Sequence, residues 1–308
     1  MTMHEEISRC WPVRKTKAQK AAFRSWVLEK AKTLGYAAQV EETKLLCRNH
    51  NIVIGDPEQA EVIVTAHYDT PAVMPIPNFI TPRNIPMYLL YQLLLLALLF
   101  VPSYAAGAAA TAMGADFSTS YWIGLAVYMA LLVLMMAGPA NRHNANDNTS
   151  GVAAVLQLME ELPENQRGKA AFILFDNEEL GMLGSSAYVG RHRKIRKEKL
   201  LINLDCVGVG EDILFFTPKK TRALPAYGPL RDIMQAQENK QVHFFPAEKS
   251  MYPSDQAQFA HGIAVCACKR HRVVGYYCSR IHTAKDTVCD QQCLDVLTYG
   301  LTKLITTL

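Results

Sequence analysis

Charged residues are almost absent from one long stretch of this sequence. Between residues 84 and 141 the only charged side chain is Asp116. A helix on the surface of a soluble protein carries a polar stripe along one side, and this stretch has almost none. The apolar run 86–101, extended by small residues to Ala112, exceeds the ~20 residues that a membrane-spanning helix needs. A second apolar run, 121–137, is nearly as long.

These two runs predict an inserted transmembrane helical hairpin at residues 85–137. A two-helix hairpin returns the chain to the side that it left, and its flanks carry Arg83 and Arg142. Because cytoplasmic flanks are enriched in Lys and Arg, we expect an integral protein of the cell membrane whose remaining residues lie in the cytoplasm. The alternative is a hydrophobic lid or a dimer-forming pair of helices. A channel is not expected, since the runs have too few polar groups to form an ion path.

Other patterns are missing as well. The eight cysteines match neither a zinc ribbon nor a disulfide framework, so we expect reduced thiols in a reducing compartment. The first residues are polar and acidic, so no cleavable signal peptide is expected. A net charge of +4 without a basic, aromatic groove pattern gives no indication of nucleic-acid binding. No internal repeat or low-complexity linker is present.

The remainder of the chain alternates between strand and helix patterns. Runs 62–66 and 171–175 are short and continuously apolar, as in strands buried on both faces. Run 200–205 is a similar strand, and runs 15–34 and 290–308 have helical periodicity. The alternation predicts a three-layer α/β/α sandwich with a mixed, mainly parallel sheet. Residues 1–84 and 138–308 would form this discontinuous domain, with the hairpin inserted between them.

Metal-ligating residue types follow these strands or lie in the loops between them. They are His67, Asp147, Glu178 with Glu179, Asp205 and His282. Open α/β sheets place their sites at the carboxyl ends of strands, and imidazole and carboxylate are zinc ligands. Two zinc ions bring a charge of +4, which three carboxylates and a bridging hydroxide neutralise. The count therefore favours two ions over one.

Five motifs in this order resemble the co-catalytic di-zinc aminopeptidase family. That family includes secreted bacterial leucine aminopeptidases, glutamate carboxypeptidase, glutaminyl cyclases and the catalytically inactive transferrin receptors. The resemblance covers the chain except roughly residues 71–140. The motifs are His67-Tyr-Asp69, Asn146-Asp-Asn-Thr-Ser-Gly151, Phe175-Asp-Asn-Glu-Glu-Leu-Gly181, Asn203-Leu-Asp205 and Ile281-His-Thr-Ala-Lys-Asp-Thr287.

The resemblance implies a role for each motif residue. Asp147 would bridge two Zn²⁺ ions, or Co²⁺ or Mn²⁺ in their place. His67 and Asp205 would complete the ligands of one ion, and Glu179 and His282 those of the other.

Three further residues would support catalysis. Asp69 would orient the His67 ring, and Glu178 would be the general base that takes a proton from the attacking water. Tyr252 resembles an oxyanion-stabilising tyrosine of some members, although an ordinary loop tyrosine is an equal interpretation.

The implied function is a membrane-anchored di-zinc aminopeptidase that removes N-terminal residues from peptides. A carboxypeptidase or amidohydrolase with the same ligands is the nearest alternative, followed by a glutaminyl cyclase and a non-enzymatic, receptor-like member. The family has a short loop where this chain has its hairpin. Pro139 lies eight residues before Asp147, a span of at most ~28 Å. The hairpin should therefore leave the bilayer close to the metals, so we expect peptides at or partly in the membrane as substrates and the bilayer as a partner.

Overall fold

Nine strands form one mixed sheet in the computed structural model, which describes residues 1–308. Eight of them follow the order β1-β2-β4-β3-β5-β8-β6-β7, and β9 pairs with the end of β8. The strands are β1 (Ala38–Leu45), β2 (Cys47–Ile54), β3 (Val62–His67), β4 (Ala170–Phe175), β5 (Leu200–Leu204), β6 (Asp212–Thr217), β7 (Gln241–Pro246), β8 (Gly262–His271) and β9 (Gly275–Tyr277).

The centre of the sheet is parallel. Strand β3 pairs with β4 on one side and β5 on the other, and β5 pairs with β8, all in parallel. Antiparallel pairs join β1 to β2, β2 to β4 and β6 to β8. At one edge β6 pairs with β7 in parallel. The predicted mixed, mainly parallel sheet is thus confirmed, with antiparallel pairs on either side of its parallel centre.

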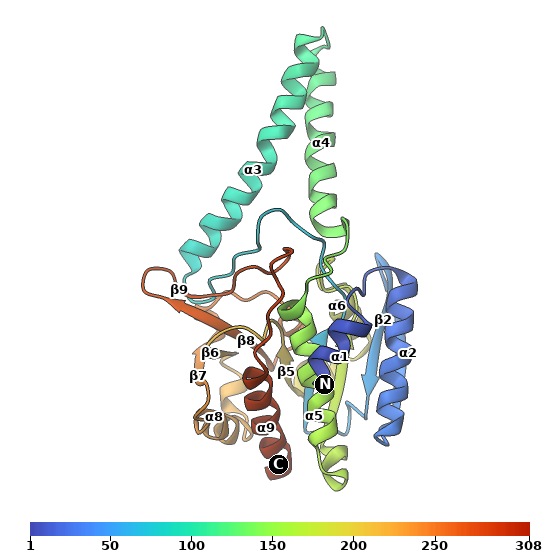
Figure 1. Ribbon diagram of the computed structural model, residues 1–308, viewed down its shortest axis with the longest axis vertical. Coiled ribbons are helices and arrows are strands. Elements are labelled where there is room, and N and C mark those ends of the chain that lie inside the picture. Colours follow the sequence, from blue (N-terminus) through green and yellow to red (C-terminus); the bar gives the residue numbers. More distant parts are fainter.

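Helices cover both faces of the sheet (Figure 1). Alternating residues of β3 show the two layers: Val62 and Val64 belong to the large core cluster that includes α2, α5 and α9, whereas Ile63 packs in the cluster with α6 and α7. Side chains of a strand alternate between faces, so a strand covered on both sides is apolar throughout. The helices of the sandwich are α1 (Met3–Cys10), α2 (Lys17–Thr33), α5 (Gly151–Glu161), α6 (Leu183–Arg191), α7 (Arg193–Glu198), α8 (Tyr227–Gln235) and α9 (Gln291–Thr307).

Two further helices, α3 (Ile85–Ala112) and α4 (Phe117–Ala137), project from the sandwich as a hairpin (Figure 1). Both are long and apolar enough to cross a membrane by length and composition. Their buried residues are few: Ser103 and Ala110 on α3, and Ser120 on α4. A core helix of a soluble protein would be mostly buried, and these are not.

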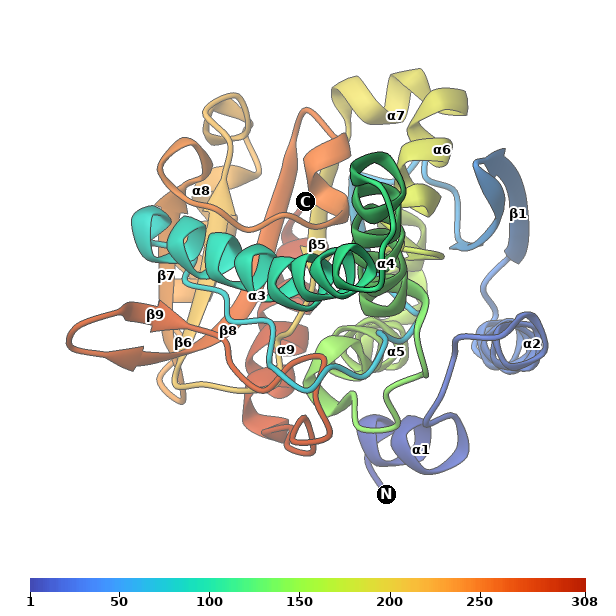
Figure 2. The ribbon, with the colours of Figure 1, turned by 90° about the horizontal axis from the view of Figure 1, so that it is seen from above.

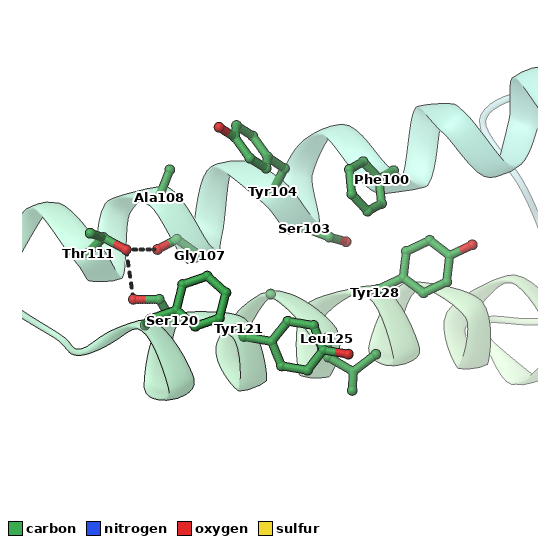
Figure 3. Close-up of a pocket in the computed structure, with 12 residues that line it drawn as sticks. Phe100, Ser103, Tyr104, Gly107, Ala108, Thr111, Ser120, Tyr121, Leu125 and Tyr128 are labelled. Atoms are coloured by element: carbon green, nitrogen blue, oxygen red, sulfur yellow. Dashed lines mark hydrogen bonds between the residues drawn. The ribbon is translucent and has the colours of Figure 1, made fainter.

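The two helices touch where their residues are small (Figure 3). A Cβ added to Gly107 would lie 2.9 Å from the backbone oxygen of Ser120, and one added to Gly124 would lie 3.0 Å from that of Ser103. Thr111 Oγ1 donates to Ser120 Oγ at 2.8 Å near the tip. Small residues that let helix backbones approach are typical of contacts between membrane helices. Toward the sandwich the two helices diverge (Figure 1).

The hairpin joins the sandwich at the carboxyl ends of the central strands. Strand β3 ends at His67, and residues 71–84 lead from it to α3. Asn84 caps α3 by accepting a hydrogen bond from the Met87 amide. On the other side, Lys15 Nζ donates to the backbone oxygen of Met136 near the end of α4. Seen along its length, the hairpin lies over the region of β5 and β8 (Figure 2).

Candidate metal centre

Three adjacent strands deliver ligands to one edge of the sheet. His67 is the last residue of β3, Asp205 follows β5, and Glu178 with Glu179 follows β4. In the parallel register His67 lies beside Phe175, so all three strands end at nearly the same level. The short apolar runs form the buried strands, and the polar residues that follow them therefore lie together at one edge of the sheet.

Asp147 comes from the turn η1 (Ala145–Ser150), directly before α5. The carboxylate of Asp286 accepts hydrogen bonds of 3.0 Å from the backbone amides of Asn146 and Asp147 and so fixes this turn. A Cβ on Gly151 would lie 2.2 Å from the backbone oxygen of Leu204, so only glycine allows α5 to start this close to β5.

His282 reaches the same place from the loop after β9. Its backbone has a φ of 62°, in the left-handed region, and its Nε2 lies 3.1 Å from Asp147 Oδ2 and 3.5 Å from Glu179 Oε2. On the other side of Asp147, His67 Nε2 lies 3.4 Å from Asp147 Oδ1 and 3.7 Å from Asp205 Oδ1. Asp147 therefore stands between two histidines, with one further carboxylate on each side.

The ligand atoms fall into two groups that share Asp147. One group is His67, Asp147 and Asp205, the other is Asp147, Glu179 and His282, and within each the atoms lie within 4.8 Å of one another. A third group, His67, Glu178 and Glu179, meets the same criterion, so Glu178 belongs to the cluster. The structure brings together all five residues predicted as ligands and the predicted base.

These residues fit a pair of zinc ions. Imidazole nitrogens and carboxylate oxygens are the ligand types of catalytic zinc. In addition, Glu179 Oε1 is buried without a hydrogen-bond partner. Buried polar atoms are normally satisfied, and a bound cation would give Glu179 Oε1 the partner that the protein does not supply.

The charges of the cluster also favour cations. Burial raises the pKa of Glu179 to about 8 and raises that of Glu178 well above its usual range. Burial opposes ionisation of Asp147 as well, but hydrogen bonds from His282 and His67 hold its pKa below its usual range. Burial thus makes ionisation of the two glutamates unfavourable, and added cations would stabilise their charged forms.

Asp69 organises the turn that carries the two glutamates. Its carboxylate accepts hydrogen bonds from the backbone amides of Glu178 at 3.1 Å and Glu179 at 3.3 Å, and it lies 3.5 Å from His67 Nδ1. Burial works against its charge, but nearby Lys20 and His67 lower the pKa of Asp69 to about 2. Asp69 is therefore a buried, ionised group that can hold both the ring and the turn.

The hydroxyl of Tyr252 donates a hydrogen bond of 2.9 Å to the backbone oxygen of Asp205. Its ring is buried and stacks on Phe216 at a centroid distance of 5.9 Å. In this arrangement the hydroxyl proton of Tyr252 is engaged in a hydrogen bond within the protein and is not directed toward an oxyanion. Its role as an oxyanion donor stays a prediction.

The prediction from sequence did not include two acids and one arginine. Asp255 is fully buried with both carboxylate oxygens unpartnered, and burial raises its pKa to about 7; it lies in the same Tyr-x-Ser-Asp segment as Tyr252. Asp286 lies within the His282 motif, so the sequence could have identified it. Arg14 lies in no motif. It is fully buried, and its guanidinium donates to the backbone oxygen of Tyr68 and to Thr149 Oγ1.

The fold and the ligand types define a class, the α/β sandwich with a candidate centre for two metal ions. The family model "Peptidase family M28" matches residues 131–298, more than half of the chain. The chain belongs to this family, which confirms the predicted resemblance and the predicted class of zinc-dependent peptidase.

Comparisons with individual proteins agree with this family. A segment of 67 residues is 40% identical to aminopeptidase YwaD of Bacillus subtilis (strain 168), and it covers 21% of this chain and 15% of that relative. Among solved structures, glutaminyl cyclase of Porphyromonas gingivalis has a TM-score of 0.61 at 14% identity, covering 99% of this chain and 96% of its own. A Zn-dependent exopeptidase of Parabacteroides distasonis has a TM-score of 0.60 at 16% identity with the same coverage. At these identities the structural likeness establishes the fold.

Proposed function

We propose that this protein is a membrane-anchored di-zinc aminopeptidase that hydrolyses the N-terminal residues of peptides. The observation that carries the proposal is the position of Asp147, whose two carboxylate oxygens each face a different histidine, His67 and His282. A carboxylate shared between two sets of ligands is what a pair of metal ions requires. Glu178 lies in the same cluster, beside Glu179.

In this proposal His67, Asp147 and Asp205 hold one zinc ion, and Asp147, Glu179 and His282 hold the other. When bound, the ions lower the pKa of water and polarise the scissile carbonyl. Glu178 accepts a proton from the attacking water and transfers it to the leaving amine. Burial raises the pKa of Glu178 above its usual range, which makes its carboxylate a stronger base for the first step. Asp69 keeps the Nδ1 side of His67 oriented, so that Nε2 faces the metal.

The domain boundaries belong to the proposal as well. Residues 1–84 and 138–308 form the peptidase domain, and residues 85–137 form an inserted transmembrane hairpin. In support, the hairpin is apolar and exposed, and the flanking Arg83 and Arg142 favour a cytoplasmic catalytic domain. The hairpin starts and ends on the side of the sheet where the ligands emerge, so the site would face the bilayer surface. Peptides that lie at or partly in the membrane would then be preferred substrates.

A peptide digest tests the activity. The purified chain is given one sequence in four forms: free at both ends, N-acetylated, C-amidated, and with an N-terminal glutamine. An aminopeptidase cleaves the first and third forms and leaves the N-acetylated form intact. Cleavage of the N-acetylated form with failure on the C-amidated form would indicate a carboxypeptidase instead. Loss of ammonia from the glutamine peptide without cleavage would indicate a glutaminyl cyclase. The Glu178→Gln variant is the control for a contaminating peptidase.

Deleting residues 85–137 and joining the ends by a short flexible linker tests the role of the hairpin. The proposal expects the deleted variant to keep its activity on soluble peptides and to lose its preference for lipid-associated ones. An unchanged ratio of the two activities would mean that the hairpin is a plain anchor.

A further inference from the structure

Three segments that meet at the base of the hairpin are basic and contain no acid. They are residues 71–84 before α3, residues 138–146 after α4, and residues 262–285, which include β8 and β9. Together they contain seven of the 32 Lys and Arg residues and none of the 28 Asp and Glu residues. Backbone hydrogen bonds join the segments, from Val73 to Pro139 and, in both directions, between Ile80 and Cys278. Positive charge is thus concentrated where the hairpin leaves the sandwich.

The turn between β8 and β9 lies beside the start of α3 (Figures 1 and 2). Asn84, the residue that caps α3, donates through Nδ2 to the backbone oxygen of Val274 at 3.4 Å. Phe79 bridges the two elements, because its ring lies 5.5 Å from that of Tyr91 on α3 and 5.6 Å from that of Tyr277 on β9. If α3 enters a bilayer at its first turn, these contacts hold the β8–β9 turn at the bilayer surface.

We define the basic turn as residues 269–274. Lys269, Arg270 and Arg272 are exposed, and none of them has an acidic partner within 4.0 Å. Val273, at the tip of the turn, is 68% exposed. Exposed cations around an exposed apolar residue match a surface of anionic headgroups above acyl chains.

We propose that the basic turn binds the anionic phospholipid headgroups of the leaflet that α3 enters, with Val273 inserted among them. Each Lys or Arg near an anionic leaflet strengthens binding by about fivefold, so the three cations together supply roughly a hundredfold. His282 follows β9 after four residues, so the contact would also hold the loop that carries this ligand toward the membrane. The inference rests on the membrane placement proposed above and not on the peptidase chemistry.

The test uses the full-length chain in lipid nanodiscs of phosphatidylcholine, with or without phosphatidylglycerol. Amide hydrogen exchange is followed in the peptides that cover residues 269–277. We expect about tenfold slower exchange in the discs that contain phosphatidylglycerol, and we expect high salt to remove the difference, because ions screen exposed charges. The triple variant Lys269→Gln, Arg270→Gln, Arg272→Gln should exchange at the same fast rate in both lipids.

A matched control removes the same charge elsewhere. Arg193, Lys194 and Arg196 are exposed residues of α7, which leads into the amino end of β5, at the opposite edge of the sheet from the hairpin. Changing these three to Gln should leave the lipid-dependent protection intact. If the protein inserts but exchanges equally in the two lipids, the inference is wrong. It is also wrong if both triple variants lose the lipid-dependent protection to the same extent. Protection that appears only when an acidic peptide is added would assign the turn to substrate instead. Failure of the chain to enter nanodiscs would overturn the membrane placement and the inference together.

Discussion

The carboxylate of Asp69 accepts a hydrogen bond of 3.1 Å from the backbone amide of Glu178. This contact ties the loop after β3 to the turn after β4. It also means that the group expected to orient a metal ligand positions the expected general base. One side chain thus serves two parts of the candidate site.

Replacing Asp69 by Asn should therefore impair both metal binding and catalysis. The amide cannot accept from both backbone amides and also favour the His67 tautomer with a proton on Nδ1. We expect zinc affinity to fall 10- to 100-fold, the usual effect of removing a group that orients a metal ligand. Titration calorimetry with zinc measures it. Asp232→Asn, at an exposed position, is the matched control, and equal affinities of the two variants would refute this role of Asp69.

Substitutions of the two neighbouring glutamates should have different effects on metal content. Glu178→Gln should lower kcat by a factor of about 10² to 10⁴, the range of general-base catalysis, and should keep the metal content of the parent. Glu179→Gln should lose metal as well as activity, since its carboxylate faces His282. Elemental analysis together with steady-state kinetics distinguishes loss of metal from loss of the general base. If Glu178→Gln also loses metal, the assignment of the base is wrong.

Tyr252→Phe distinguishes a structural from a catalytic tyrosine. Its hydroxyl bonds the backbone oxygen of Asp205, so its removal should destabilise the protein by about 1 kcal/mol, the net value of a typical hydrogen bond. Thermal unfolding measures that change. We expect kcat to fall less than tenfold. A fall of a hundredfold or more with unchanged stability would instead support the predicted oxyanion donor.

Zinc binding should release protons at neutral pH. Burial raises the pKa of Glu179 to about 8. Burial opposes the charge of His282, but Glu179 and Asp147 raise its pKa to about 9. Protein stripped of metal by a chelator therefore holds at least one proton on this pair of residues at pH 7, and zinc binding requires its removal. Affinity should then rise with pH up to about 9 and fall at least roughly tenfold per unit below pH 7. Calorimetry in buffers of different ionisation enthalpy counts the protons, and a count of zero would contradict the ligand set.

The elements that the sequence predicted best are those whose pattern is set by burial on both faces. The runs 62–66 and 171–175 became β3 and β4, in which every residue is buried. Strands β7 and β9 and helix α1 were not foreseen. The residues of β7 are mostly half-buried, and this edge strand ends in a proline, so its pattern resembles a loop. Such edge elements depend on neighbours that the local sequence does not identify.

The same distinction applies to the site. The sequence identified the five candidate ligands because each lies in a short motif at the end of an element. They are His67, Asp147, Glu179, Asp205 and His282. Arg14 could not be found this way, since its partner Tyr68 is 54 residues away and the contact exists only after the chain has folded. Asp255 was passed over beside Tyr252, because a buried carboxylate without a partner is visible only in three dimensions.

The most direct test of the account is the zinc content of the full-length protein and of its Asp147→Asn variant, measured by elemental mass spectrometry after dialysis. Asp147 belongs to both ligand groups, so the account predicts two zinc ions per chain in the parent and the loss of both in the variant. A parent with one ion or none, or a variant that keeps the zinc of the parent, would contradict the shared-carboxylate centre on which the proposed peptidase depends.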